Sequence, residues 1–285
     1  MLYFVSTPIG NLKDISYRAI ETLNAADVIA CEDTRTTLKL LNRYDIKKRL
    51  IAYHKFNEKS ECEKIIVMAE EGLNVAVVSD AGTPLVSDPG NELSRELTRR
   101  GIKYTVVPGA TAFTSALVLS GLDADRFSFI GFLPEKKSEA EKLLEPYKNL
   151  PSTLIFYSAP HDLKKTIARL YEILGEREAA VVKEITKIHE RAERIKLSQG
   201  TTEEEPRGEY VVVVEGGKPR ENPLNALPIE SQVEAYIADG LSKMDAIKKV
   251  AKERGLKKSD VYGYIEKTRT RIFLPSDKNS FSKSL

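Results

Sequence analysis

Residues 75–90 of the chain read VAVVSDAGTPLVSDPG. The β-branched run at 75–78 is typical of a buried strand, and the small, glycine- and proline-rich residues after it predict a turn. Four further short apolar runs occupy residues 2–5, 28–31, 50–53 and 103–107. Amphipathic stretches with helical periodicity lie between several of these runs. This strand–helix alternation with short loops predicts a parallel α/β sheet that is covered on both faces.

The pattern changes after residue 113. Further strands are predicted at residues 127–132, 153–157, 179–183, 195–197 and 210–214, and helices at 138–147 and 162–174. The later strands follow one another without helices, which predicts a mixed, partly antiparallel sheet. We therefore expect an N-terminal α/β lobe over residues 1–113 and a second α/β lobe over residues 114–220.

A purely helical region follows a glycine- and proline-rich linker. Helices are predicted at residues 230–239, 242–254 and 258–269, with Ser242 as a start signal and Gly255 as a stop signal for the second. We expect a separate helical domain over residues 227–272. Its pattern fits a helix-turn-helix and fits a small helical bundle equally well.

The composition excludes several classes of protein. The 285 residues include only two cysteines, Cys31 and Cys62, and three histidines, so neither a disulfide framework nor a cysteine–histidine zinc site is expected. No apolar run approaches the roughly 20 residues of a membrane span, and the first residues do not form a signal peptide. We expect a soluble cytoplasmic protein with no bound metal and no membrane contact.

Charge is distributed unevenly along the chain. Lys plus Arg total 44 and Asp plus Glu total 42, which gives a net charge of +2. Residues 241–285 alone contain twelve basic and five acidic residues. A basic C-terminal end on a mildly acidic body suggests contact with a polyanion, although a solvated helical surface explains the same count.

Four loops follow strands of the first sheet, and because the strands are parallel, these loops are predicted to lie at one edge of it. Ligands of open parallel sheets bind at this edge, at the carboxyl ends of the strands. These loops are residues 6–11, 31–35, 79–84 and 107–112. None contains a dinucleotide-binding or P-loop motif. Their glycines and small side chains leave backbone groups accessible, and they contain few fixed positive charges, so they favour a neutral or zwitterionic ligand over a polyphosphate.

The combination of motifs resembles a known family. The motifs that carry the resemblance are TPIGNL (7–12), CEDTR (31–35), SDAGTPLVSDPG (79–90), VPGATA (107–112), GFLP (131–134), FYSAPHDL (156–163), KEITKIHE (183–190) and GEYVVVVEG (208–216). Together they are similar to the ribosomal RNA small subunit methyltransferase I family. That family belongs to the tetrapyrrole methylase-like, class III S-adenosylmethionine methyltransferases.

The resemblance implies a two-lobed fold, a homodimer, and S-adenosylmethionine in the cleft between the lobes. The implied reaction is 2′-O-methylation of a cytidine ribose in the decoding region of 16S rRNA of the small ribosomal subunit. The resemblance also implies that the cofactor is bound by residues of these loops and of the second lobe. The expected cofactor-binding residues are Pro8, Ser79, Asp80, Ala81, Gly82, Pro108, Gly109, Ala112, Ile130, Val211, Val212 and Val213.

Candidates for the chemistry and for RNA contact also follow. Proton acceptors are sought among Glu32, Asp33, His54 and Glu184, while Arg35 and Lys187 are candidates to bind RNA phosphates or to lower the pKa of the ribose hydroxyl. An Arg35–Asp33 ion pair and a structural histidine are the simpler alternatives. The expected RNA-binding residues are Arg35, Lys243, Lys248, Lys249, Lys252, Lys257, Lys258, Tyr262, Lys267, Arg269 and Arg271.

Two other functions remain open at this point. A methyltransferase of the same fold can act on a tetrapyrrole-like small molecule, which the basic C-terminal end speaks against. A non-catalytic RNA-binding relative can keep the fold as a scaffold, which the nearly complete set of loops speaks against. Binding of S-adenosylmethionine and the identity of the methylated product discriminate among the three.

Overall fold

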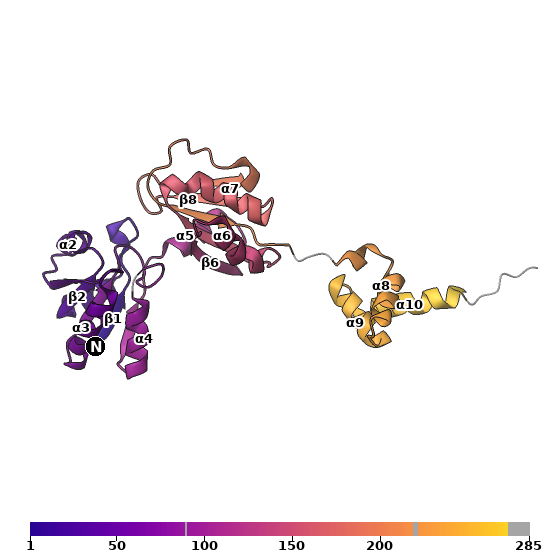
Figure 1. The fold of residues 1–285 in the computed structure, drawn as a ribbon, viewed down its shortest axis with the longest axis horizontal. Coiled ribbons are helices and arrows are strands. Elements are labelled where there is room, and N and C mark those ends of the chain that lie inside the picture. The colour runs from indigo at the N-terminus through magenta and orange to yellow at the C-terminus, as the bar shows by residue number, and fades with distance from the viewer. Residues whose placement is uncertain (89, 219–221, 273–285) are drawn as a thin grey trace, which may run out of the picture. The chain divides into compact units, whose positions relative to one another are not determined.

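The computed structural model describes residues 1–88, 90–218 and 222–272, with side chains up to residue 266. The chain forms two compact units, Met1–Gly217 and Lys218–Leu285. The first unit contains two lobes, each built on its own five-stranded sheet (Figure 1). The lobe boundary expected near residue 113 falls at the start of α5 (Ala112–Ser120), the helix that follows the last strand of the first sheet.

The sheet of the first lobe is fully parallel, as predicted. Its strands are β1 (Leu2–Val5), β2 (Val28–Cys31), β3 (Arg49–Ala52), β4 (Val75–Val78) and β5 (Tyr104–Val107). They lie in the order β3-β2-β4-β1-β5. The carboxyl ends of β1, β2 and β4 are therefore adjacent, and the loops that follow them meet at one edge of the sheet.

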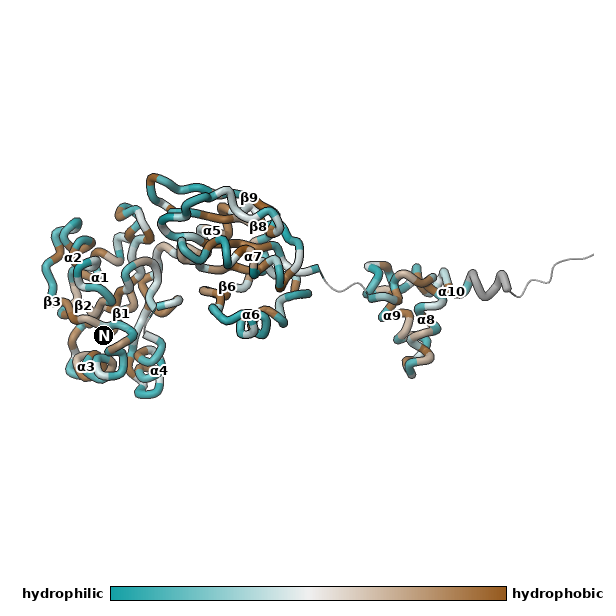
Figure 2. The backbone as a smooth tube through the Cα atoms, turned by 45° about the horizontal axis from the view of Figure 1, so that its top comes forward, coloured by the Kyte–Doolittle hydropathy of each residue, from teal (hydrophilic) through white to brown (hydrophobic). Residues whose placement is uncertain are grey.

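Helices cover both faces of this sheet because side chains alternate along each strand. Phe4 and Val77 face α3 (Glu58–Glu70) and α4 (Asn91–Arg100). Val5, Ile29 and Val78 face α1 (Tyr17–Ala25) and α2 (Thr34–Arg43). Figure 2 shows brown, hydrophobic segments within each lobe and teal, hydrophilic ones mainly on the outer helices and loops.

The sequence pattern did not predict α2. Its first turn contains Thr34, Thr36 and Thr37, and threonine has low helix propensity. The helix forms because the Asp33 carboxylate accepts a hydrogen bond from the Arg35 backbone N–H at 2.8 Å and caps its N-terminus. Packing of the buried Leu40 and Leu41 then stabilises it.

The sheet of the second lobe is mixed, as predicted. Its strands are β6 (Phe127–Phe132), β7 (Thr153–Ser158), β8 (Glu178–Lys183), β9 (Arg191–Lys196) and β10 (Tyr210–Val214), in the order β6-β7-β10-β8-β9. The β6–β7 pair is parallel, and β10 is antiparallel to both β7 and β8. Helices α6 (Lys137–Leu144) and α7 (Leu163–Leu174) cover one face, and α5 packs on the other.

The second unit contains three helices in its described part. They are α8 (Ile229–Ala238), α9 (Lys243–Glu253) and α10 (Lys258–Ile272), packed around Val233, Ile247, Val250 and Val261. The predicted signals around α9 are confirmed: Ser242 accepts from the Asp245 N–H, and Gly255 adopts a φ of 64° just after the helix. Among the described helices, none has the length and apolarity needed to cross a membrane.

Candidate active site

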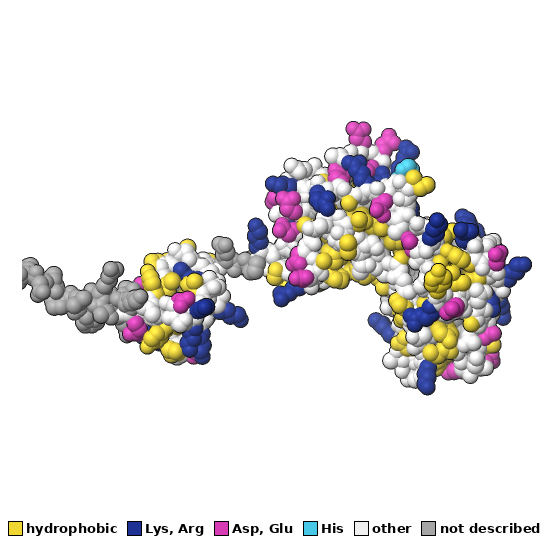
Figure 3. Space-filling model, turned by 180° about the vertical axis from the view of Figure 1, so that it is seen from behind, with side chains coloured by type: hydrophobic (Ala, Val, Ile, Leu, Met, Phe, Trp, Pro, Cys, Tyr) yellow, Lys and Arg dark blue, Asp and Glu magenta, His cyan; other side chains and the backbone are white. Residues whose placement is uncertain are grey.

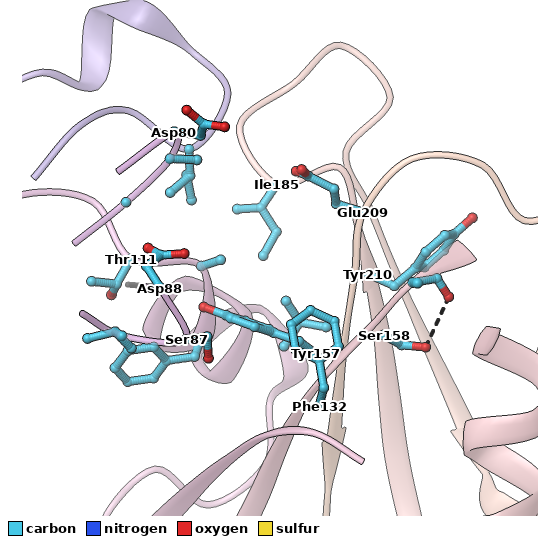
Figure 4. A pocket seen from close by; sticks show the side chains of 18 of the residues that line it. Asp80, Ser87, Asp88, Thr111, Phe132, Tyr157, Ser158, Ile185, Glu209 and Tyr210 are labelled. Atoms are coloured by element: carbon cyan, nitrogen blue, oxygen red, sulfur yellow. Dashed lines mark hydrogen bonds between the residues drawn. The ribbon is translucent and has the colours of Figure 1, made fainter. Parts of the chain in front are cut away.

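A cavity of about 420 Å³ lies between the two lobes of the first unit (Figure 4). This size is within the range of small-molecule sites. The first lobe contributes Ile9 and the segment 80–88 after β4, and the second lobe contributes Tyr157 and Val211 from β7 and β10. Among the described lining residues none is basic, whereas Asp80, Asp88 and Glu209 are acidic.

Asp88 gives this cavity its electrostatic character. Figure 4 shows its carboxylate directed into the space between the lobes. Burial raises the pKa of Asp88 to about 6, the Ser79 hydroxyl partly offsets this through a hydrogen bond, and the nearby Asp80 raises it further. Burial also raises the pKa of Asp80. A bound cation would relieve the cost of holding these two carboxylates together in a half-buried site.

The backbone that carries these acids is strained. Leu85 and Ser87 adopt positive φ values of 74° and 68°, which non-glycine residues rarely do. Gly82, with a φ of 80°, forms a β-bridge with Thr7 of the loop after β1. Such strain concentrates at ligand sites, where the surrounding structure holds the backbone in place.

Aromatic side chains form the opposite wall. Phe113 of α5 stacks on Phe129 of β6 with ring centroids 4.7 Å apart. Tyr157 of β7 contacts the rings of both Phe129 and Phe132 edge-on, at 4.9 and 5.6 Å. Phe113, Phe132 and Tyr157 line the cavity and offer flat apolar surface to a heterocyclic ring.

Two glycines allow close approach of backbone at this edge. A Cβ atom on Gly109 would lie 2.9 Å from the Ser6 Cβ, so the loops after β1 and β5 meet only because the residue is glycine. A Cβ atom on Gly10 would lie 2.7 Å from both Lys187 and Thr186 of the second lobe. Beside it, the Asn11 backbone N–H donates to the Thr186 hydroxyl at 2.9 Å, which links the lobes.

The predicted cofactor residues divide into two groups. Those that line the cavity are Asp80, Ala81, Gly82, Ala112 and Val211. Those outside its lining are Pro8, Ser79, Pro108, Gly109, Ile130, Val212 and Val213. Ser79 is buried next to the lining: its hydroxyl donates to the Ala81 carbonyl oxygen at 3.3 Å, and the Ser79 side chain partly lowers the pKa of Asp88. Val212 and Val213 are fully buried in the core of the second lobe.

The acidic residues after β2 lie beside the cavity and not in its lining. Asp33 is bound by Arg35 through two side-chain hydrogen bonds of 3.1 and 2.7 Å. Hydrogen bonds from the Arg35 side chain and backbone lower the pKa of Asp33 to about 2. The Asp33 backbone N–H in turn donates to Asp80 at 3.1 Å. This ion pair is the simpler alternative that the sequence left open.

Glu32 is in a different state from its neighbour. Burial raises the pKa of its carboxyl group, and the nearby Asp80 and Asp88 raise it further. His54 lies close enough to interact with Glu32 electrostatically, and its Nδ1 atom is buried without a hydrogen-bond partner among the described residues. Neither side chain has an ion pair among the described residues, whereas Asp33 is paired with Arg35.

The predicted pair Glu184 and Lys187 forms an ionic cluster with a third residue. Lys187 Nζ lies 2.9 Å from Glu184 Oε1 and 3.0 Å from Glu209 Oε2, and Glu209 lines the cavity. Burial alone raises the pKa of Glu184, but hydrogen bonds from Lys187 and from the Glu209 backbone N–H outweigh it and lower the pKa. Glu184 and Thr186 also adopt positive φ values of 48° and 66°.

The predicted RNA-binding residues of the second unit, which we call the helical unit, differ in whether their side chains already have partners. Lys243 pairs with Glu266, Lys248 pairs with Asp245, and Lys249 lies over the Tyr236 ring. Lys252, Lys257 and Lys258 are exposed, and Tyr262 is exposed beside Lys243. The side chains of Lys267, Arg269 and Arg271 lie outside the described residues.

Several cavity residues were missed by the sequence reasoning. They are Asp88, Phe113, Phe132, Tyr157 and Glu209. All but Phe113 occur within quoted motifs, and Phe113 directly follows VPGATA, so the signal was present. What the sequence did not show was which residue of each motif turns toward the cavity. No group of three or more potential metal ligands occurs among the residues whose placement is described.

Comparison with known proteins places the chain in a family. Residues 1–200 match the model of the Tetrapyrrole (Corrin/Porphyrin) Methylases. The ribosomal RNA small subunit methyltransferase I of Halalkalibacterium halodurans is 44% identical over 268 residues, covering 92% of this chain and 93% of that protein. The protein of the same name from Escherichia coli O157:H7 is 40% identical over 271 residues, covering 92% and 93%.

Solved structures agree on the fold. Diphthine synthase has a TM-score of 0.61 at 19% identity, covering 75% of this chain and 89% of that one. The methyltransferase CobJ has a TM-score of 0.60 at 20% identity, covering 75% and 93%. The fold is therefore the predicted two-lobed methylase fold, and the chain belongs to the ribosomal RNA small subunit methyltransferase I family within the tetrapyrrole methylases.

Proposed function

We propose that this chain transfers a methyl group from S-adenosylmethionine to the 2′-oxygen of a cytidine ribose in the decoding region of 16S rRNA. The curated relatives are named ribosomal RNA small subunit methyltransferases. A solved neighbour of the same fold, a uroporphyrin-III C-methyltransferase with a TM-score of 0.52 and 19% identity over 74% of this chain and 96% of that one, is complexed with S-adenosylhomocysteine. The observation that carries the proposal is the cavity, which is lined by Asp80, by the half-buried Asp88 and by an aromatic wall.

The residues present suit this donor. When bound, S-adenosylmethionine supplies a methyl group that its sulfonium centre makes electrophilic. Asp88 and Asp80 offset positive charge on the ligand, and their raised pKa values fall again when a cation binds. Phe113, Phe132 and Tyr157 would offer flat apolar surface to its adenine ring. The absence of basic residues from the described lining disfavours a phosphorylated ligand.

The chain's own contribution to the reaction is mainly positioning. Holding the ribose oxygen in line with the methyl group accounts for much of the rate, and removal of the hydroxyl proton assists. We assign removal of the ribose hydroxyl proton to Glu32. Its pKa is raised, so its carboxylate is a stronger base than that of Asp33 or Glu184, whose pKa values are lowered. His54 lies near enough to interact electrostatically with Glu32.

The remaining expectations from the resemblance form part of this proposal. We propose a homodimer that works in the cytoplasm on the small ribosomal subunit. Exposed apolar side chains at Val118, 77% exposed, and at Phe127 and Val106 supply surface that a second copy would cover. Molar mass from light scattering tests the dimer.

Methyl transfer to small ribosomal subunits tests the reaction. Subunits from a strain that lacks this methylation receive labelled methyl groups, and the modified nucleotide is then mapped. We expect a single labelled cytidine whose 3′-phosphodiester bond resists alkaline hydrolysis. Glu32→Gln should slow turnover while donor binding stays intact. Label appearing on a tetrapyrrole and not on RNA would replace this function with the small-molecule alternative.

A further inference from the structure

One segment of the first lobe differs in charge from the rest of the chain. Residues 34–59 contain eight basic and two acidic residues, a net charge of +6. Outside this segment and the basic residues 241–285, the chain has a net charge of −11. The first lobe therefore carries a strongly basic segment on an otherwise acidic body.

The fold arranges this charge in an ordered way. Arg35, Lys39 and Arg43 are spaced four residues apart on α2, so they lie along one side of the helix. Three more cations, Lys47, Lys48 and Arg49, follow directly and lead into β3. Strand β3 is an edge strand, so this side of the sheet is not covered by another strand. At a rise of 1.5 Å per residue, the α2 cations extend over about 12 Å.

These cations are free to bind a ligand. Among the described residues, only Arg35 of the eight has an ion pair, with Asp33, and the other seven side chains have no ion pair or hydrogen bond. All are exposed except Lys48, which is half-buried. Elsewhere in the first unit many basic side chains are paired, as in the Arg100–Glu63 and Lys183–Glu203 bridges. On the face drawn in Figure 3, dark blue side chains project from the first lobe.

An aromatic side chain accompanies the charge. Phe56 is 96% exposed, although a phenylalanine is normally at least partly buried. Lys55 and Lys59 flank it in sequence, and its ring lies edge-on to His54 at 6.1 Å. A basic surface with an exposed aromatic ring is what single-stranded nucleic acid requires, because phosphates bind the cations and a base stacks on the ring.

The surface begins at the candidate active site. Strands β2 and β3 are parallel neighbours, so Arg35 after β2 and Phe56 after β3 lie toward the same edge of the sheet. Arg35 interacts electrostatically with Asp80, which lines the cavity. From this edge α2 runs back to Lys47 at the other end of the strands. A strand of RNA on this surface would pass the mouth of the cavity at one end.

We infer that the exposed basic side chains of residues 34–59, together with Phe56, bind the substrate RNA; we call them the α2 surface. The inference rests on the proposed function and moves the main RNA contact from the helical unit to the first lobe. In the helical unit, Lys243, Lys248 and Lys249 already have partners within the unit. The α2 surface holds the phosphates of the nucleotides next to the target, and Phe56 stacks an unpaired base.

A triple variant of the full-length protein tests this inference. Lys39→Gln, Arg43→Gln and Lys47→Gln remove three free cations and leave Arg35 and the cavity untouched. The matched control is Arg95→Gln, Lys103→Gln and Lys142→Gln, which removes three exposed cations without described partners from other parts of the first unit. Binding is measured with a fluorescein-labelled single-stranded RNA of the target region at several salt concentrations, and turnover with small ribosomal subunits.

The triple variant should bind this RNA about tenfold or more weakly at low salt, with the slope of log affinity against log salt reduced by about 2. Its KM for subunits should rise more than its kcat falls, and its affinity for S-adenosylmethionine should stay that of the wild type. Phe56→Ala should weaken RNA binding about fivefold with an unchanged salt slope. The control triple should stay within about threefold of the wild type, since it changes only the overall charge.

Equal RNA affinity of the triple variant and the control would overturn the inference and leave the proposed function standing. Failure of the wild type itself to methylate subunits, with donor binding intact, would overturn the proposed function first and this inference with it. A loss of donor affinity in the triple variant would also count against the inference, because it would show damage to the fold in place of a lost RNA contact.

Discussion

Two neighbouring loops of the first lobe contain carboxylates in opposite states. After β2, Asp33 is held by Arg35, and its pKa is lowered to about 2. After β4, Asp88 has no cationic partner among the described residues, and burial raises its pKa to about 6. The first carboxylate already has its counter-ion and serves the fold, because it caps α2. The second is held in the cavity without one, which is the state expected of a group that waits for a cationic ligand.

The largest expected effect is a loss of donor affinity when Asp88 is neutralised, which should far exceed the effect of neutralising Asp33. Asp88→Asn keeps the size of the side chain and its contact with Ser79 but removes the charge. We expect the dissociation constant for S-adenosylmethionine to rise about 100-fold, as is typical when one partner of a desolvated charge pair is lost. Isothermal titration calorimetry measures it, and Asp33→Asn is the matched control. Equal losses in the two variants would show that the two loops do not differ in function.

The pH dependence of donor binding should sharpen the comparison. Because the pKa of Asp88 is raised to about 6, its charge and its attraction for a cation are lost as the pH falls through that value. We expect affinity to fall about tenfold between pH 7.5 and 5.0. Asp33 contributes nothing in this window, since its pKa of about 2 lies well below it. If the donor affinity of Asp88→Asn fell with pH as steeply as that of the wild type, another titrating group would be responsible.

Stability of the ligand-free protein should move in the direction opposite to binding. The folded-state pKa of Asp88 is raised from its ordinary value near 4 to about 6, so stability is lost as the pH rises from about 4 to about 6, and the loss is complete above that value. Asp88→Asn should therefore raise the melting temperature by about 2–4 °C at pH 8 and leave it nearly unchanged near pH 3.5, where the carboxyl group is protonated in the folded state and largely protonated in the unfolded state. Differential scanning fluorimetry at the two pH values checks this. A lower melting temperature at pH 8 would contradict the assignment.

The smallest effect is expected at the α2 cap. Asp33→Ala removes the acceptor of the Arg35 backbone N–H and should lower the melting temperature by about 2 °C, whereas Asp33→Asn keeps a capping oxygen and should lower it less. Both measurements are made without ligand at pH 7.5. An Asn variant as unstable as the Ala variant would show that the charge of Asp33 matters more than its cap.

The sequence predicted the fold better than the site. Strands with continuous apolar runs, such as β4 and β10, are fully buried and therefore visible in the pattern. Helix α2 was missed because its threonines obscure the helical pattern and its stability comes from a cap and from packing. The loops were located correctly, but Asp88 was not singled out, since its role depends on the strained backbone at Leu85 and Ser87, which turns it inward.

The charge on α2 shows a related limit. Arg35, Lys39 and Arg43 lie on one side of a helix, but their four-residue spacing has this meaning only once the helix itself is known. The C-terminal end stands out by its number of cations, twelve in residues 241–285 against eight in residues 34–59. The structure shows that the number of cations is a poor guide to how many are available, since a lysine paired with a neighbouring acid has less charge to offer a ligand.

Gly10 has a consequence for how this protein can be altered. Since even a methyl group there would collide with Lys187 and Thr186, position 10 tolerates no gradual change in side-chain size. The first step away from glycine has to displace atoms of the second lobe, including the Thr186 hydroxyl that accepts from the Asn11 N–H. Alanine at position 10 is therefore the smallest change that tests how closely the two lobes must pack.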